Sequence, residues 1–265
     1  GDGRSRSKGT GGPSWVASSA VPKSTVSGRA VSSTAVRSPV VPAPAGLGLD
    51  SAAVRQRMVQ RLAAGGIQSQ KVLSAMGQVQ RHLFVDSALV NQAYEDTSLP
   101  IGLQQTISKP SVVARMIELL EGAEYVRAMG RMGRVLEIGT GCGYQAAVLA
   151  CVAQQVYSVE RLRGLHDKAR NNLRPLKLTN IHLLFGDGML GYAPGAPYAG
   201  IISAAGGDAV PQAWLDQLAI GGRLVAPIVK GKGQQALLVI DKTQHGYTES
   251  VLEAVHFVPL KSGIA

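Results

Sequence analysis

Cysteine, long apolar runs and aromatic residues are all scarce in this sequence. The two cysteines, Cys142 and Cys151, lie in a glycine-rich turn and in the helix expected after it, where a rise of about 1.5 Å per residue separates them too far to bond. Neither has the His or Cys neighbours of a zinc site. We therefore expect no disulfide, no structural metal and a reducing, cytoplasmic compartment.

The sequence has no run of about 18 apolar residues, and its Ser- and Arg-rich start lacks a continuous hydrophobic segment. Neither a membrane span nor an ordinary secretory signal is expected. Aromatic residues make up only 5% of the chain, which disfavours the stacking platform of a module that reads RNA sequence.

Acidic residues are outnumbered, 17 against 27 basic ones, and the formal net charge of +10 suggests a nucleic-acid partner. The distribution of the charge weakens that interpretation, because half of the excess lies in residues 1–49. Later basic residues fall at mixed helical spacings, which is typical of a solvated helix face. These residues are Arg161, Arg163, Lys168, Arg170 and Arg174.

Residues 1–46 are rich in Ser, Gly, Pro, Ala and Val and show no helical or strand period. Such a composition buries too little apolar surface to offset the entropy of ordering, so we predict a disordered basic tail. An organelle transit peptide has a similar composition, but a bacterial-type extension is the favoured interpretation. Residues 47–265 are then expected to form one globular domain.

Three helices are expected at the start of this domain. The first follows Asp50 as its N-cap, and the second begins at Ser69. The third opens at Pro110, after a loop that starts at Leu99. Apolar residues at helical spacing mark the first two helices: Val54, Met58, Leu62, Val72, Leu73 and Met76.

From residue 135 onward, short apolar runs alternate with helical stretches. The runs cover residues 135–138, 156–159, 181–185, 201–203, 224–228, 236–240 and 251–258. That alternation predicts an α/β fold with a doubly wound, mostly parallel, Rossmann-like sheet covered by helices. Residues 242–250 are too few for a crossover helix, so the last two runs are predicted to form an antiparallel hairpin at one edge.

The sharpest motif is an apolar strand that runs into three glycines spaced by two, Gly139, Gly141 and Gly143, with Thr140 after the first. Glycines let the backbone turn tightly and approach a ligand without a Cβ in the way. The spacing differs from the G-x-G-x-x-G of a dinucleotide site. Glu137, just before the turn, suits the positively charged amino-acid end of S-adenosylmethionine better than the anionic pyrophosphate of NAD.

Acidic residues also end the next two strands. Glu160 stands where a carboxylate accepts both ribose hydroxyls of an adenosine, and Asp187 stands where one accepts from the adenine amino group. Each acid alone has another interpretation as a turn residue or helix cap, but ligands of open α/β sheets bind at these carboxyl strand ends. We therefore predict the site of a class I S-adenosylmethionine-dependent methyltransferase. Its expected cofactor residues are Glu137, Gly139, Thr140, Gly141, Gly143, Glu160, Arg161, Asp187 and Gly188.

The loop before the third helix contains a string of distinctive residues, Pro100, Ile101, Gly102, Gln105, Thr106, Ile107, Ser108 and Pro110. This string resembles the Pro-Ile-Gly-x-Gly-Gln-Thr-Ile-Ser-x-Pro loop of the protein-L-isoaspartate O-methyltransferase family, of the bacterial type. The similarity extends over about residues 49–260, through the glycine turn and the strand-end acids. The resemblance implies that S-adenosylmethionine donates a methyl group to the free carboxylate of L-isoaspartyl residues, which initiates repair of damaged proteins.

The resemblance also implies roles for individual residues. Ser108 and Thr106 are expected to be catalytic, and Ile107, Gln105 and Pro259 are expected to contact the substrate. Ser108 has the alternative of merely capping the helix that begins at Pro110.

The sequence departs from the family pattern at several positions. Gln104 stands where the family usually has Gly, Ala199 where Asp is usual, and His256 where Arg is common. These departures bear on turnover and substrate geometry more than on cofactor binding, because the three strand-end acids are all retained.

Two other functions remain open from the sequence. One is a methyltransferase of the same fold that acts on a small molecule or RNA, and the other is an S-adenosylmethionine-binding homologue with little activity. For the favoured function, the expected partners are damaged proteins or peptides with L-isoaspartyl residues. No stable nucleic-acid complex and no membrane association are expected, and the chain is expected to be a monomer.

Overall fold

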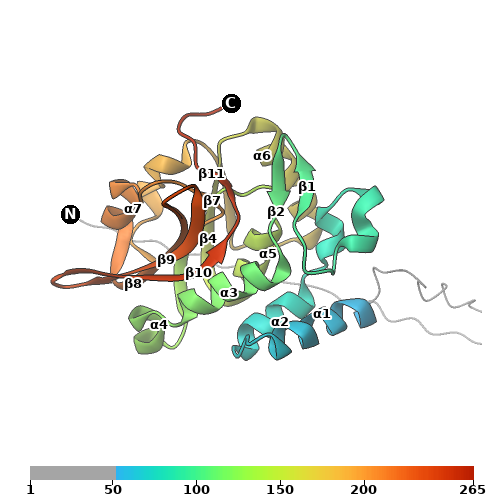
Figure 1. The fold of residues 1–265 in the computed structure, drawn as a ribbon, viewed down its shortest axis with the longest axis horizontal. Helices are drawn as coiled ribbons and strands as arrows, with labels where there is room; N and C mark the ends of the chain where they lie inside the picture. Colours follow the sequence, from blue (N-terminus) through green and yellow to red (C-terminus); the bar gives the residue numbers. More distant parts are fainter. Residues whose placement is uncertain (1–51) are drawn as a thin grey trace, which may run out of the picture. The chain divides into compact units, whose positions relative to one another are not determined.

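The structure is built around a sheet of seven strands. The strands are β3 (Met132–Ile138), β4 (Ala153–Glu160), β5 (Ile181–Phe185), β6 (Tyr198–Ser203), β8 (Leu218–Lys230), β9 (Gln234–Thr243) and β10 (Gly246–Val255). Their order is β10-β9-β8-β6-β3-β4-β5, with all pairs parallel from β8 to β5 and antiparallel pairs from β8 to β10 (Figure 1). This is a computed structural model that describes residues 52–265, so the predicted tail over residues 1–46 and the predicted cap Asp50 lie outside the described residues.

The helices cover both faces of the sheet. They are α1 (Ala52–Ala64), α2 (Gln70–Gln78), α3 (Pro110–Glu121), α4 (Glu124–Met129), α5 (Tyr144–Val152), α6 (Arg163–Leu173) and α7 (Gln212–Gln217). The predicted starts of two of them are confirmed: the Ser69 hydroxyl accepts from the backbone N–H of Val72 at 3.1 Å, and Pro110 opens α3. None of the helices in residues 52–265 has the length and hydropathy needed to cross a bilayer.

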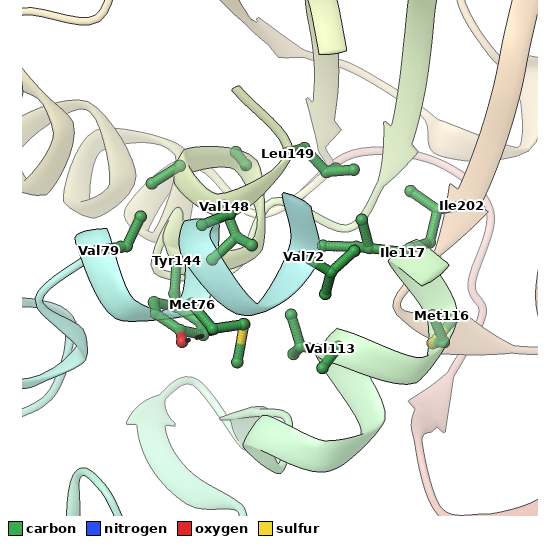
Figure 2. Packing of buried hydrophobic residues seen from close by; sticks show 14 of the residues in the cluster. Val72, Met76, Val79, Val113, Met116, Ile117, Tyr144, Val148, Leu149 and Ile202 are labelled. Atoms are coloured by element: carbon green, nitrogen blue, oxygen red, sulfur yellow. Dashed lines mark hydrogen bonds between the residues drawn. The ribbon is translucent and has the colours of Figure 1, made fainter. Parts of the chain in front are cut away.

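Neighbouring residues of the central strands enter two different cores, because successive side chains of a strand point to opposite faces. Val135 and Ile202 belong to the core under α2, α3, α5 and α6, whereas Leu136 and Ile201 belong to the core under α7. Figure 2 shows the first core, where side chains of α2, α3 and α5 pack together beside Ile202 of β6. The predicted doubly wound α/β fold with N-terminal helices is therefore confirmed.

The antiparallel edge hairpin is also confirmed, but its predicted extent is wrong. Most of residues 242–250, expected to connect two strands, belong to β9 and β10, which pair from Thr243 and Gly246 onward. Residues 246–250 carry no apolar run, because they lie in the edge strand β10, where most side chains are exposed, so the sequence pattern does not mark them as strand. The predicted end of the last strand is wrong as well, since Val258 lies in a separate short strand, β11 (Val258–Pro259), which pairs in parallel with β7 (Ala205–Gly206).

The segment expected as a loop before α3 contains a second small sheet. Strands β1 (Leu99–Gly102) and β2 (Gln105–Ile107) form an antiparallel hairpin that has no partner in the seven-stranded sheet. The apolar residues Leu99, Ile101 and Ile107 are buried and hold its inner side on the body of the protein.

Candidate cofactor and substrate site

A cavity of about 480 Å³ lies at the carboxyl ends of β3 and β4. The β1–β2 hairpin forms one wall, the glycine turn and the end of β4 form another, and residues 258–261 form a third. Eight of the predicted site residues line it: Gln105, Thr106, Gly139, Gly141, Glu160, Arg161, Gly188 and Pro259. The cavity thus gathers residues from both halves of the domain at the position where open α/β sheets bind ligands.

The glycine turn has a backbone that other residues rarely adopt. Gly139, Gly141 and Gly143 have φ values of 89°, 57° and 92°, all in the left-handed region. A Cβ on Gly141 would lie 3.2 Å from the Cδ1 atom of Ile101, which belongs to the hairpin wall. The glycines therefore let the turn and the hairpin approach each other across the cavity.

Glu160 joins the glycine turn to the end of β4. Its side chain is buried, and its two carboxylate oxygens accept from the backbone N–H groups of Gly141 and Leu162, both at 2.9 Å. A carboxylate offers about four lone-pair positions, so acceptor capacity remains on the cavity side. This position agrees with the predicted role of Glu160 toward ribose hydroxyls, which stays a prediction.

Glu137 is fully buried and does not line the cavity. Its carboxylate accepts from the Ser158 hydroxyl and, at 3.0 Å, from the Nε2 atom of Gln145, while Ser158 also bonds to Thr140. Gln145 and Thr140 line a smaller adjoining cavity of about 40 Å³. A direct contact of Glu137 with a cofactor amine stays a prediction, and the structure shows a network that connects Glu137 to the glycine turn.

Burial raises the pKa of Glu137 from its ordinary value of 4.5 to about 7, and the bonds from Ser158 and Gln145 partly oppose this effect. Between these two pH values the native state holds a proton that the unfolded chain has lost. The free energy of unfolding therefore falls as the pH rises from about 4.5 to about 7. We expect Glu137→Gln to gain stability relative to the wild type, on the order of 3 kcal/mol, between about pH 4.5 and pH 7.5. Urea unfolding of both proteins across this range measures the difference, and parallel pH profiles would contradict it.

Asp187 lies outside the large cavity, although Gly188 lines it. The Asp187 carboxylate accepts from the backbone N–H groups of Met189, at 2.9 Å, and Gly263, at 2.7 Å. Arg161 contacts the same C-terminal segment, because its Nε donates to the Gly263 carbonyl at 3.0 Å. Contact of Asp187 with adenine stays a prediction, and both residues fix residues 262–263 beside the cavity.

The basic residues near α6 agree only in part with the solvated face expected for them. Arg163, Arg170 and Arg174 are exposed, as predicted. Lys168 instead donates to the backbone carbonyl of Ile101 at 2.7 Å, and the guanidinium of Arg163 lies 3.6 Å from the ring centre of Phe185. Of the side chains that the charge pattern assigns to solvent, Lys168 and Arg161 thus contact the walls of the site.

The predicted catalytic residues lie where the two cavities meet. Thr106 lines both cavities, and Ser108 and Ile107 line the smaller one with Thr140 of the glycine turn. Within residues 52–265, the Ser108 hydroxyl makes no hydrogen bond, and the N-cap of α3 is Lys109 without a side-chain cap bond. The alternative that Ser108 merely caps α3 is therefore wrong, and its hydroxyl is available to a ligand.

Sequence reasoning missed several residues of the site. They are Leu103, Ser158, Gln145, Leu260 and Lys261. Ser158 carries a signal, since it is a polar residue inside the apolar run 156–159, and it lies opposite Glu137 in the register of β3 and β4.

The sequence model of the protein-L-isoaspartate(D-aspartate) O-methyltransferase family matches residues 53–265. The chain belongs to this family. A protein-L-isoaspartate O-methyltransferase of Methylibium petroleiphilum is 62% identical over 222 residues, which cover 83% of this chain and 81% of that protein. The corresponding protein of Leptothrix cholodnii is 58% identical over 221 residues, which cover 83% and 77%.

Solved structures share the fold of this chain. One protein-L-isoaspartate O-methyltransferase superposes with a TM-score of 0.71 at 29% identity, over 79% of this chain and 67% of that one. A Plasmodium falciparum chain, solved in complex with S-adenosyl-L-homocysteine, superposes with a TM-score of 0.64 at 24% identity, over 78% and 98% of the two chains. At 24% identity, the similarity to the Plasmodium falciparum chain shows a shared fold and nothing more.

Proposed function

We propose that this chain is an enzyme that transfers a methyl group from S-adenosylmethionine to the free carboxylate of L-isoaspartyl residues in damaged proteins and peptides. The observation that carries the proposal is the family membership, at up to 62% identity to named relatives over most of both chains. The coincidence of the glycine turn, Glu160 and Thr106 around one cavity supports it.

The residues of the cavity fit the cofactor. A volume of about 480 Å³ lies in the range of small-molecule sites, roughly 300–1,000 Å³. Gly139 and Gly141 leave room for close approach of a ligand to the backbone, and Glu160 presents free acceptor capacity for hydroxyl groups. These three residues would hold S-adenosylmethionine, and the smaller cavity would join its reactive end to Ser108.

The mechanism needs little acid–base chemistry. When bound, S-adenosylmethionine supplies an electrophilic methyl group on a sulfonium. The isoaspartyl carboxylate, with a pKa of about 4, is already ionised at neutral pH, so no residue has to remove a proton. The free hydroxyl of Ser108 donates to this carboxylate and orients it, while the hairpin with Thr106 closes the wall and excludes water.

The test uses two peptides that differ only in one residue, Asp or isoAsp, together with labelled S-adenosylmethionine. We expect a base-labile methyl ester on the isoAsp peptide alone. Equal labelling of both peptides, or binding of the cofactor without labelling of either, would refute the proposed substrate. Label on added RNA or on a small molecule instead would select one of the other methyltransferase functions.

The finer properties of the enzyme are also proposals. We place it in the cytoplasm as a monomer, with no stable nucleic-acid complex and no membrane association. The free thiols of Cys142 and Cys151 agree with a reducing compartment. The use of Arg161 and Lys168 in internal contacts leaves fewer basic groups for phosphates.

A further inference from the structure

The β1–β2 hairpin is a wall of the site that has little stability of its own. It has only two strands, pairs with no other strand of residues 52–265, and contains Pro100, which lacks a backbone N–H. An isolated two-stranded hairpin is marginally stable in water. Contacts with the rest of the protein must therefore fix its position.

The turn of the hairpin makes this dependence stronger. Leu103 and Gln104 form the two-residue turn with φ values of 51° and 58°, both left-handed. Such turns favour Asn-Gly or other residues that tolerate this backbone, and neither Leu nor Gln is one of them. The local sequence opposes the turn that the structure contains, so the hairpin must be stabilised from outside.

Burial of Leu99, Ile101 and Ile107 holds the inner side of the hairpin, and helix α6 adds one polar and one apolar contact. The ammonium group of Lys168 donates to the Ile101 carbonyl at 2.7 Å, and this is the only hydrogen bond from elsewhere in residues 52–265 to residues 99–107. At the tip, the Cδ1 atom of Leu103 lies 3.0 Å from the position that a Cβ would take on Gly164 of α6. Lys168 is half-buried, which strengthens a charge-assisted hydrogen bond.

We propose that Lys168 is a positioning residue that holds the β1–β2 hairpin against α6 and thereby slows the exchange of cofactor. The inference rests on the proposed function, because the cavity that the hairpin closes is taken as the S-adenosylmethionine site. Ile101 and Thr106 of the hairpin line that cavity, and the strand of Thr106 leads directly to Ser108. A hairpin that lifts from α6 opens the cavity and displaces both predicted catalytic residues.

The decisive variants are Lys168→Gln, which removes the charged donor, and Lys168→Arg, which restores one. Arg170→Gln is the matched control, since it removes the same charge from an exposed position two residues along α6. Gly164→Ala is an independent variant, because its Cβ would push against Leu103 while Lys168 stays in place. Replacing glycine by alanine inside a helix does not by itself weaken the helix, because alanine has the higher helix propensity.

Two readouts are measured: the dissociation rate of S-adenosylhomocysteine, and amide hydrogen exchange of residues 101–106 in cofactor-free protein. We expect Lys168→Gln to raise the dissociation rate by roughly tenfold, the scale of one charge-assisted hydrogen bond, and to speed the exchange of these amides. Lys168→Arg should return both toward the wild type. Gly164→Ala should shift both in the same direction but by less, because the Leu103 side chain that it meets is exposed and can rotate away, and Arg170→Gln should change neither.

The proposal is overturned if Lys168→Gln dissociates no faster than Arg170→Gln, or if the hairpin amides exchange at the wild-type rate. If Lys168→Gln does not fold, Lys168→Met is measured in its place, since methionine keeps most of the apolar stem of the side chain and lacks the donor. Wild-type protein that binds no S-adenosylhomocysteine refutes the proposed function, and the exchange of the hairpin amides still decides whether Lys168 holds the hairpin.

Discussion

Binding of S-adenosylmethionine is expected to weaken by about 1.5–3 kcal/mol when Glu160 is replaced by alanine. The carboxylate of Glu160 is buried, holds the N–H groups of Gly141 and Leu162, and faces the cavity with its remaining acceptor capacity. The substitution removes the acceptor for ribose hydroxyls and leaves two backbone donors without their partner. Titration calorimetry with S-adenosylmethionine measures the loss.

The control for this substitution is Glu249→Ala, which removes an acid of the same type from an exposed position on β10. It should leave cofactor affinity unchanged. Melting temperatures of both variants separate a binding effect from a general loss of stability. Wild-type affinity in a folded Glu160→Ala protein would remove Glu160 from the site and with it the assignment of the cavity.

The sequence alone predicts the strand ends and much of the cofactor side of the site. Its signals are local: a glycine pattern whose three φ values are positive in the structure, and an acid that directly ends an apolar strand, as Glu160 does. Each of these signals comes from a few adjacent residues, and the parallel sheet then places them at one edge. Such features need no knowledge of long-range contacts.

The features that sequence reasoning missed depend on residues far apart in the chain. The role of Glu137 follows from Ser158 and Gln145, which reach it only through the strand register and the packing of α5. The β1–β2 hairpin lacks the usual turn residues, so nothing local marks it as two strands. The local sequence predicts a solvated Lys168, because its partner, the Ile101 carbonyl, comes from a distant part of the chain.

Replacing Ser108 by alanine is expected to lower kcat/KM for an isoaspartyl peptide by roughly ten- to a thousandfold, about 1.4–4 kcal/mol, with little change in cofactor affinity. Ser108 lines the small cavity beside Thr140, and its hydroxyl has no partner among residues 52–265. It also lies just before α3, where backbone N–H groups favour an anion. The hydroxyl is therefore placed to bind and orient the substrate carboxylate, while cofactor contacts come from the strand ends.

Ser111→Ala provides the matched control, because Ser111 stands in the first turn of the same helix and has a structural partner. Its hydroxyl bonds to Asp96 at 2.7 Å, and its backbone N–H donates to the same carboxylate at 2.9 Å. We expect Ser111→Ala to lower the melting temperature while the folded protein keeps its rate. We expect Ser108→Ala to keep its melting temperature and to lose rate. Initial rates, cofactor affinity and melting temperature measured on one preparation of each variant distinguish the two. Full activity in a folded Ser108→Ala protein would show that this serine does not act on the substrate.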